Sequence, residues 1–264
     1  MAADLAQVAE RLRAMHAGPE PLILPNAWDV ASALAVERAG APAVATTSSG
    51  VAATLGYEDG EAMGAEDMLA AVGRIASAVR VPVTADLEAG YGLPAEALVD
   101  GLLGAGAVGL NLEDTIRDGT PRLGPMELQA ERIAAVRAAA TAAGVPVVIN
   151  ARIDTFLRGG GGAEQRLSDA IARGRAYLAA GADCVYPITL DDAHAIERFV
   201  AEVGGVVNIL LRPGSPSLAA LAELGVRRVS VGGGLWRHAM HRAEELARDL
   251  LAGQDAAFGE LGEA

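Results

Sequence analysis

Three acidic residues follow two apolar runs at positions where their carboxylates could act together. Asp86 and Glu88 end the run VPVTADLE, and Glu113 ends the run GLNLE. Alternate residues of a strand point the same way, so Asp86 and Glu88 should be neighbours, joined by Glu113 from the adjacent strand. Like charges held together repel unless a cation lies between them, and carboxylates without a nearby His or Cys favour Mg²⁺, with Mn²⁺ as the second choice. The competing interpretation is that these acids pair with arginines or cap helices.

An arginine follows another apolar run. Arg152, in INARID, can bind a carboxylate through two parallel hydrogen bonds, which suits an organic-acid substrate. The alternative is a salt bridge to Glu113 or Asp154, and such a pairing could coexist with ligand binding.

The segment TTSSG places small polar residues Thr47, Ser48 and Ser49 after a further apolar run. Backbone N–H groups in a tight turn can hold a carboxylate or a developing oxyanion, although clusters of Ser, Thr and Gly also occur in turns without a ligand. Asn208, in VVNIL, is a further predicted substrate-binding residue.

These residues require a scaffold in which many strand ends meet. Apolar runs alternate with helical patterns rich in Ala and Arg, and glycine marks the helix-to-strand junctions, as in AAGVPVVIN. Near-continuous apolar runs are typical of parallel strands covered on both faces. The predicted strands are 22–26, 43–47, 81–88, 108–113, 147–154, 183–188, 207–211 and 228–232.

Eight strands alternating with helices predict an α/β fold, a (β/α)8 TIM barrel, with residues 1–264 forming one domain that ends in a helical extension. An open doubly wound sheet is the alternative, but the GxGxxG fingerprint is missing after the first strand. In a barrel, functional side chains collect at the C-terminal ends of the strands.

Composition narrows the function. The formal charge of −13 disfavours binding to nucleic acid or to anionic membrane surfaces, and no apolar run is long enough to span a bilayer. The N-terminal segment is predicted as an amphipathic helix and not as an export signal, which favours a cytoplasmic enzyme. All 21 basic residues are arginine, so Schiff-base and pyridoxal-phosphate chemistry on lysine is excluded. The single cysteine, Cys184, excludes an internal disulfide and is predicted to be a buried core thiol.

The order of four segments resembles the isocitrate lyase/phosphoenolpyruvate mutase superfamily: TTSSGVAATLGYEDG, VTADLEAGYG, GLNLED and INARID. The resemblance extends from PNAWDVASA to VSVGGGL. It implies a (β/α)8 barrel whose C-terminal helix swaps between the subunits of a homodimer or homotetramer. It also implies Mg²⁺ and a small α-keto acid, of the pyruvate, oxaloacetate or 2-oxoglutarate type, or its enolate.

The resemblance also implies roles for single residues. By position, Asp86 resembles the direct carboxylate ligand of the metal. Three further acids resemble those that contact the metal through water or support it: Glu88, Glu113 and Asp59. The residues that resemble the segment holding the keto acid are Thr47, Ser48 and Ser49. Arg152 resembles the arginine that stabilises the enolate or the carboxylate, and Arg152 and Glu113 are the predicted catalytic residues.

The sequence departs from the superfamily in the predicted lid. The lyases carry KKCGH after the fourth strand, with the cysteine as an acid, whereas this chain has TIRDGTPRLGPMEL. The Asn-Ser lid pair of the phosphomutase and the histidine after its sixth strand are also unmatched, with Pro187 near the place of that histidine. Glu88 stands where the superfamily has Asp. Four lid residues have no assigned role: Thr115, Arg117, Thr120 and Arg122.

These features together predict a Mg²⁺-dependent enzyme that binds a small α-keto acid and stabilises its enolate. Carbon–carbon lysis or decarboxylation is the preferred reaction. Phosphonopyruvate-type P–C chemistry is the second reading, and a non-catalytic protein that binds α-keto acids is the third.

Overall fold

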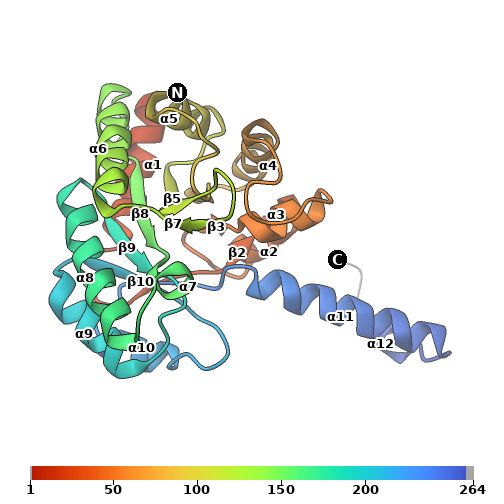
Figure 1. Ribbon diagram of the computed structural model, residues 1–264. Coiled ribbons are helices and arrows are strands. Elements are labelled where there is room, and N and C mark those ends of the chain that lie inside the picture. Colours follow the sequence, from red (N-terminus) through yellow and green to blue (C-terminus); the bar gives the residue numbers. More distant parts are fainter. Residues whose placement is uncertain (1, 260–264) are drawn as a thin grey trace.

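The computed structural model describes residues 2–259, which form a barrel of parallel strands surrounded by helices (Figure 1). Nine strand segments form one sheet in the order β1-β11-β10-β9-β8-β5-β4-β3-β2. These segments are β1 (Leu22–Leu24), β2 (Asn26–Ala27), β3 (Val44–Thr46), β4 (Val83–Asp86), β5 (Gly109–Glu113), β8 (Val148–Ile153), β9 (Cys184–Pro187), β10 (Val206–Leu210) and β11 (Arg228–Ser230). Each of the eight predicted strands overlaps an observed one.

The barrel closes through its first strand. β1 pairs with β11 and β2 pairs with β3, and only Pro25 separates β1 from β2. Proline has no N–H to donate to a neighbouring strand, so it interrupts the first strand without ending it. Counted as one strand, β1 and β2 complete a (β/α)8 barrel, and the predicted fold is confirmed. Met1 and residues 260–264 of the predicted domain lie outside the described residues.

Helices join the strands, and most of them cover the outside of the barrel. They are α1 (Ala2–Met15), α2 (Val30–Arg38), α3 (Ser48–Thr54), α4 (Ala65–Ala78), α5 (Ala95–Gly104), α6 (Met126–Ala142), α7 (Thr155–Arg158), α8 (Ala163–Ala179), α9 (Ala193–Val203), α10 (Leu218–Glu223), α11 (Gly234–Leu251) and α12 (Ala256–Gly259). In α4 the buried residues Met68, Ala71, Val72 and Ile75 recur at helical spacing, which gives the helix one apolar face toward the strands. Gly106, after α5, has φ +80°, as expected where glycine ends a helix before the next strand.

Two elements depart from the simple strand–helix alternation. Between β5 and α6 lies a short antiparallel hairpin of β6 (Thr115–Ile116) and β7 (Arg122–Leu123), which is the predicted lid segment. The strand predicted over 81–88 is shorter in the structure, where β4 ends at Asp86.

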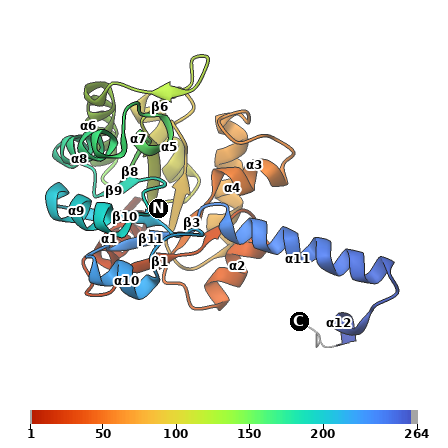
Figure 2. The same cartoon turned by 60° about the horizontal axis from the view of Figure 1, so that its bottom comes forward.

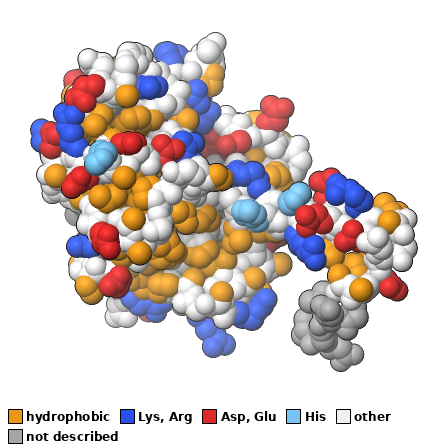
Figure 3. All heavy atoms as spheres, turned by 90° about the horizontal axis from the view of Figure 1, so that it is seen from below, with side chains coloured by type: hydrophobic (Ala, Val, Ile, Leu, Met, Phe, Trp, Pro, Cys, Tyr) orange, Lys and Arg blue, Asp and Glu red, His pale blue; other side chains and the backbone are white. Residues whose placement is uncertain are grey.

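The helix α11 extends away from the barrel (Figures 1 and 2). None of its residues is buried, and Leu251 is 91% exposed. Hydrophobic side chains also spread over the face of the barrel next to this extension (Figure 3). A helix in a protein is stabilised mostly by packing against other elements, because a lone helix in water gains little stability from its own backbone. With no buried residue, α11 has little of this packing. No helix among residues 2–259 combines the length and the apolar character that crossing a membrane requires.

Candidate active site

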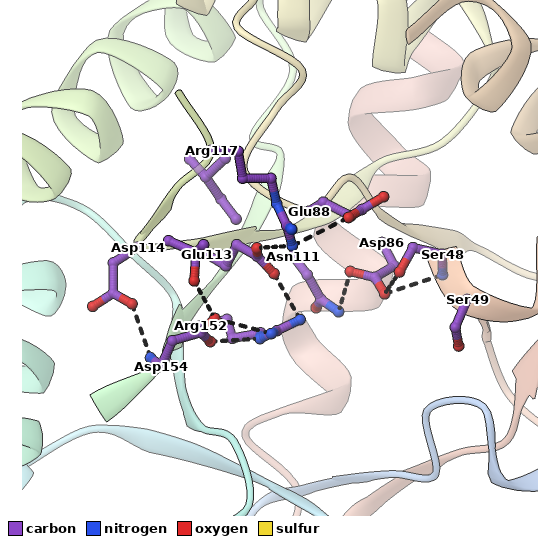
Figure 4. Close-up of polar contacts among 12 residues, drawn as sticks. Ser48, Ser49, Asp86, Glu88, Asn111, Glu113, Asp114, Arg117, Arg152 and Asp154 are labelled. Atoms are coloured by element: carbon purple, nitrogen blue, oxygen red, sulfur yellow. Dashed lines mark hydrogen bonds and ion pairs between the residues drawn. The ribbon is translucent and has the colours of Figure 1, made fainter. Parts of the chain in front are cut away.

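Side chains from the ends of β4, β5 and β8 and from the start of α3 meet at one end of the barrel (Figure 4). Asp86 is the last residue of β4. The backbone N–H and the hydroxyl of Ser48 donate to its Oδ2 at 3.1 and 2.9 Å, and Asn111 Nδ2 donates to its Oδ1 at 3.3 Å. These donors are all neutral, and among the described residues Asp86 has no ion pair. Asp86 is therefore a carboxylate held in place whose charge no arginine contacts.

Glu88 lies two residues beyond the end of β4 and is buried. Its φ of +49° is in the left-handed region, so the backbone turns and the alternation of a strand no longer applies. Oε1 accepts from the Tyr91 hydroxyl at 3.0 Å, and Oε2 lies 3.3 Å from Arg117 Nη2. Burial, with the charges of Asp86 and Asp59, raises the pKa of Glu88 to about 7.

Glu113 ends β5 and is bound by two arginines. Arg117 Nη2 donates to Oε1 at 2.6 Å, and Arg152 Nη1 contacts Oε2 at 2.7 Å. Burial raises the pKa of Glu113 above its ordinary value, and the two guanidinium groups oppose that rise.

Arg152, on β8, holds two acids at once. Its Nε and Nη2 donate to the two carboxylate oxygens of Asp154 at 2.7 and 3.0 Å, while Nη1 contacts Glu113. The salt bridges considered from the sequence are thus both present. A guanidinium has five N–H groups, and with 13% of the side chain exposed it keeps donors for a ligand.

Behind Arg152 lies a buried network. Asp154 Oδ2 accepts from Thr115 Oγ1 at 2.5 Å, and the Asp154 N–H donates to Asp114 Oδ1 at 2.8 Å. Asp114 Oδ2 accepts from Arg173 Nη1 at 2.9 Å and from the Tyr177 hydroxyl at 2.7 Å. Burial and the charge of Asp154 raise the pKa of Asp114, which the hydrogen bonds and Arg173 oppose. The network fixes Asp154 and, through it, the guanidinium of Arg152.

The TTSSG segment forms the start of α3, so the expected tight turn is wrong, whereas the substrate-binding role of Thr47, Ser48 and Ser49 stays a prediction. Ser48 uses its N–H on Asp86, whereas the hydroxyls of Thr47 and Ser49 lie 3.1 Å apart. At Gly50 a Cβ atom would lie 2.8 Å from Thr47 and 2.9 Å from Trp28, so glycine permits the close approach of α3 to its neighbours.

Two predicted site residues are not brought into this group. Asp59 is exposed in the loop between α3 and α4, where its charge still raises the pKa of Glu88. Asn208 is fully buried in β10, and its Nδ2 donates to Ser230 Oγ at 3.3 Å.

Sequence reasoning missed the role of Asn111, which lies between Asp86 and the arginine network (Figure 4). Asn111 stands two residues before Glu113 on β5, so the alternation applied to Asp86 would have placed it on the same side. It also missed Tyr186, which β9 places opposite Arg152 in the strand pairing.

The lid residues have distinct partners. Arg117 reaches both Glu88 and Glu113, and its Nη1 would lie 2.8 Å from a Cβ at Gly60, so the guanidinium closely approaches the loop before α4. Arg122 pairs with Asp118 on the exposed hairpin. Thr120 is exposed.

The donor set fits a hydrated cation better than a cage of acids. Within residues 2–259, no three acidic, His or Cys side chains are arranged to hold one ion. Asp86, Glu88 and Glu113 therefore do not form a three-acid cage, because Glu88 leaves the strand and Arg117 lies between the two glutamates. Their roles around a metal stay a prediction. Asp86 presents a hard carboxylate without a cationic partner, and Mg²⁺ commonly binds one or two carboxylates and keeps several waters.

The family of this chain is identified by comparison with the sequence models of known protein families. The sequence model described as Phosphoenolpyruvate phosphomutase matches residues 12–251. The chain belongs to the phosphoenolpyruvate phosphomutase family. The resemblance to the isocitrate lyase/phosphoenolpyruvate mutase superfamily is thereby confirmed.

Other members of the phosphoenolpyruvate phosphomutase superfamily align over most of the chain. The 2-methylisocitrate lyase of Salmonella typhimurium is 32% identical over 218 residues, which cover 78% of this chain and 71% of that enzyme. A solved structure from Burkholderia cenocepacia J2315, provisionally named a phosphonomutase, is 38% identical with a TM-score of 0.87 and covers 93% of this chain and 99% of its own. A second from the same organism, provisionally a lyase/mutase, is 36% identical with a TM-score of 0.89, covering 98% and 94%.

Proposed function

We propose that this protein is a Mg²⁺-dependent enzyme that binds a small α-keto acid and stabilises its enolate. The observation that carries the proposal is the contrast at Asp86. This carboxylate is oriented by Ser48 and Asn111 but has no ion pair among the described residues, whereas Arg152 lies close by with its position fixed by two acids. A free carboxylate and a fixed guanidinium at one barrel mouth suit a cation and an organic anion bound side by side.

Each residue then has a defined task. When bound, a divalent cation would supply Lewis-acid stabilisation of negative charge on the keto acid's oxygens. Asp86 would hold that cation, with Glu88 and Glu113 contacting its waters and Asp59 farther out. Arg152 would donate to the anionic end of the substrate, and a preorganised donor of this kind stabilises developing charge most strongly where water is excluded. Ser49, next to Thr47 at the start of α3, would contact the substrate carboxylate, and we assign Asn208 no direct contact because it bonds Ser230.

Two reactions are consistent with this arrangement. Carbon–carbon lysis or decarboxylation is our preferred reaction, supported by the 2-methylisocitrate lyase that aligns over 78% of the chain. The second candidate is P–C bond chemistry, which the phosphoenolpyruvate phosphomutase match favours. Both reactions leave an enolate to be stabilised, so they share the tasks of Asp86 and Arg152.

The experiment is a turnover assay on pyruvate, oxaloacetate, 2-oxoglutarate, 2-methylisocitrate and phosphonopyruvate, each with Mg²⁺ and with EDTA. We expect Mg²⁺-dependent cleavage of a C–C bond by the wild type and none by Asp86→Asn, which keeps the size of the side chain. Turnover of phosphonopyruvate alone would select the second candidate. Mg²⁺-dependent binding of these acids without any turnover would instead identify a non-catalytic binding protein.

We also propose that α11 packs against a second copy of the chain, giving a homodimer or homotetramer. The support is that none of the residues of α11 is buried although Leu235, Met240 and Leu250 are apolar. Sedimentation equilibrium of the full chain should give two or four subunits, and a monomer at micromolar concentration would contradict this. We propose separately that the protein is cytoplasmic, as expected from its sequence. Fractionation of the source cells tests this location.

A further inference from the structure

Arg228 is a guanidinium buried inside the barrel without a carboxylate partner among the described residues. It is the first residue of β11 and is 1% exposed. Its two hydrogen-bond partners are neutral: His16 Nε2 lies 3.4 Å from Nη1, and Asn111 Oδ1 lies 3.5 Å from Nη2. Burying a charge without a counter-charge is costly. A fold that keeps such a group commonly uses it at a functional site.

His16 supplies one end of this contact from outside the sheet. It follows the helix α1 directly and is buried, and its Nδ1 lies 2.9 Å from the carbonyl oxygen of Leu12. A carbonyl can only accept, so Nδ1 carries the proton and Nε2 is free to accept from Arg228. Burial, together with the charge of Arg228, lowers the pKa of His16 to about 4, which keeps the ring a neutral acceptor near pH 7.

Asn111 supplies the other end and connects it to the site. Its Oδ1 accepts from Asn150 Nδ2 at 2.7 Å and from Arg228, so the carbonyl side of the amide faces the barrel interior. The NH₂ side must then face the opposite way, where it donates to Asp86 Oδ1. Two donors on one oxygen thus decide which way the amide points.

We propose that Arg228 and Asn111 are positioning residues for Asp86. The buried guanidinium, held by His16, fixes the amide of Asn111, and that amide orients the carboxylate of Asp86. The charge of Asp86 also acts on Arg228, because it opposes the fall that burial causes in the pKa of this guanidinium. The orientation of Asn111 does not depend on the proposed function. The effect of that orientation on metal binding rests on the proposed function.

The first test reads Asn111 directly in the metal-free protein. The side-chain ¹⁵N–¹H₂ signals of Asn111 are identified by their loss in Asn111→Ala. In Arg228→Met we expect these signals to shift and their exchange with solvent to quicken by about tenfold or more, because one of the two fixing hydrogen bonds is lost. Thr84→Val is the matched control, since Thr84 is equally buried on β4 and its hydroxyl has no partner among the described residues. Unchanged Asn111 signals in Arg228→Met would overturn the proposal.

Arg228→Lys serves as the second variant, because it keeps the charge and most of the volume. One ammonium cannot span His16 and Asn111 as the planar fork does. We therefore expect Arg228→Lys to release Asn111 as well, and wild-type signals in that variant would contradict the positioning role.

The second test measures Mn²⁺ affinity by electron paramagnetic resonance in a double-mutant cycle. Arg228→Met should weaken Mn²⁺ binding by about tenfold in the wild type and by far less in Asn111→Ala, because the effect passes through the amide. An equal loss of Mn²⁺ affinity in the wild type and in Asn111→Ala would show that Arg228 does not act through Asn111. A wild type that binds no Mn²⁺ would refute the metal in the proposed function, and the Asn111 signals would still decide the positioning role.

Discussion

Two pairs of acids at the same barrel mouth differ in how completely they are satisfied. The closed pair, Asp114 and Asp154, is buried and receives hydrogen bonds from Arg152, Arg173, Tyr177 and Thr115. The open pair, Asp86 and Glu88, receives neutral donors and one contact from Arg117 at 3.3 Å. Pairing with arginine and tyrosine donors, and not acidity alone, therefore separates acids that support the fold from acids available to a ligand.

Loss of a closed acid should have the largest effect on stability. Asp114→Ala leaves Arg173 and Tyr177 without their shared acceptor, so we expect unfolding free energy to fall by about 3–5 kcal/mol and the Tm to fall by roughly 10 °C. Urea denaturation measures this. A loss below about 1 kcal/mol would show that the closed pair is not structural.

Loss of an open acid should leave the fold intact and remove binding. Asp86→Ala should lower Mn²⁺ affinity by about a hundredfold or more, corresponding to about 2.7 kcal/mol, while unfolding free energy changes by about 1 kcal/mol or less. Calorimetric titration with Mn²⁺ measures the affinity. Wild-type affinity in this variant would remove Asp86 from the metal site.

Arg152 links the closed pair to the rest of the site, because it binds Asp154 of the closed pair and also contacts Glu113 at the end of β5. Arg152→Lys should weaken binding of pyruvate by about tenfold, since an ammonium cannot reproduce the planar fork. Equilibrium dialysis with labelled pyruvate and Mg²⁺ provides the measurement. If affinity stays at the wild-type value and only stability falls, Arg152 belongs with the closed pair.

These contrasts mark where sequence reasoning succeeds and fails. The barrel was predictable because apolar runs and glycine junctions repeat along the chain, and Asp86 was predictable because it ends a run. Glu88 was misplaced because the alternation rule does not extend past a strand into a left-handed turn. The reach of Arg117 to two glutamates depends on how the β6–β7 hairpin folds back, and no local pattern encodes that contact.

His16, which contacts Arg228 in the barrel interior, gives a pH-dependent comparison. Its folded pKa of about 4 lies below the ordinary value of 6.5, so the unfolded chain binds the extra proton between these values. The contribution of His16 to the free energy of unfolding is therefore complete above about pH 6.5 and is lost as pH falls toward 4. By pH 5.5 the loss is roughly 1 kcal/mol. Urea denaturation at pH 7 and 5.5 should show this loss in the wild type and a smaller one in His16→Leu. Equal losses would show that His16 is not buried as a neutral ring.

Arg117 should give the smallest effect and the opposite sign. Its guanidinium lies against Glu88 and Glu113, where it repels a second cation. Arg117→Gln should therefore raise the affinity for Mn²⁺ alone by about threefold, as expected for a partly exposed charge. Titration at low and high salt tests this, because the gain should shrink as salt screens it. Weaker Mn²⁺ binding by this variant would show that Arg117 supports the metal site.

The proposed chemistry requires that Asp86 is free to bind a divalent cation beside Arg152. A crystal structure of the wild type grown with Mg²⁺ and pyruvate examines this arrangement. We expect electron density for a cation bound to Asp86, with the keto acid between that cation and Arg152. Pyruvate elsewhere, or Asp86 bonded only to Ser48 and Asn111 with no cation beside it, would refute the proposed site.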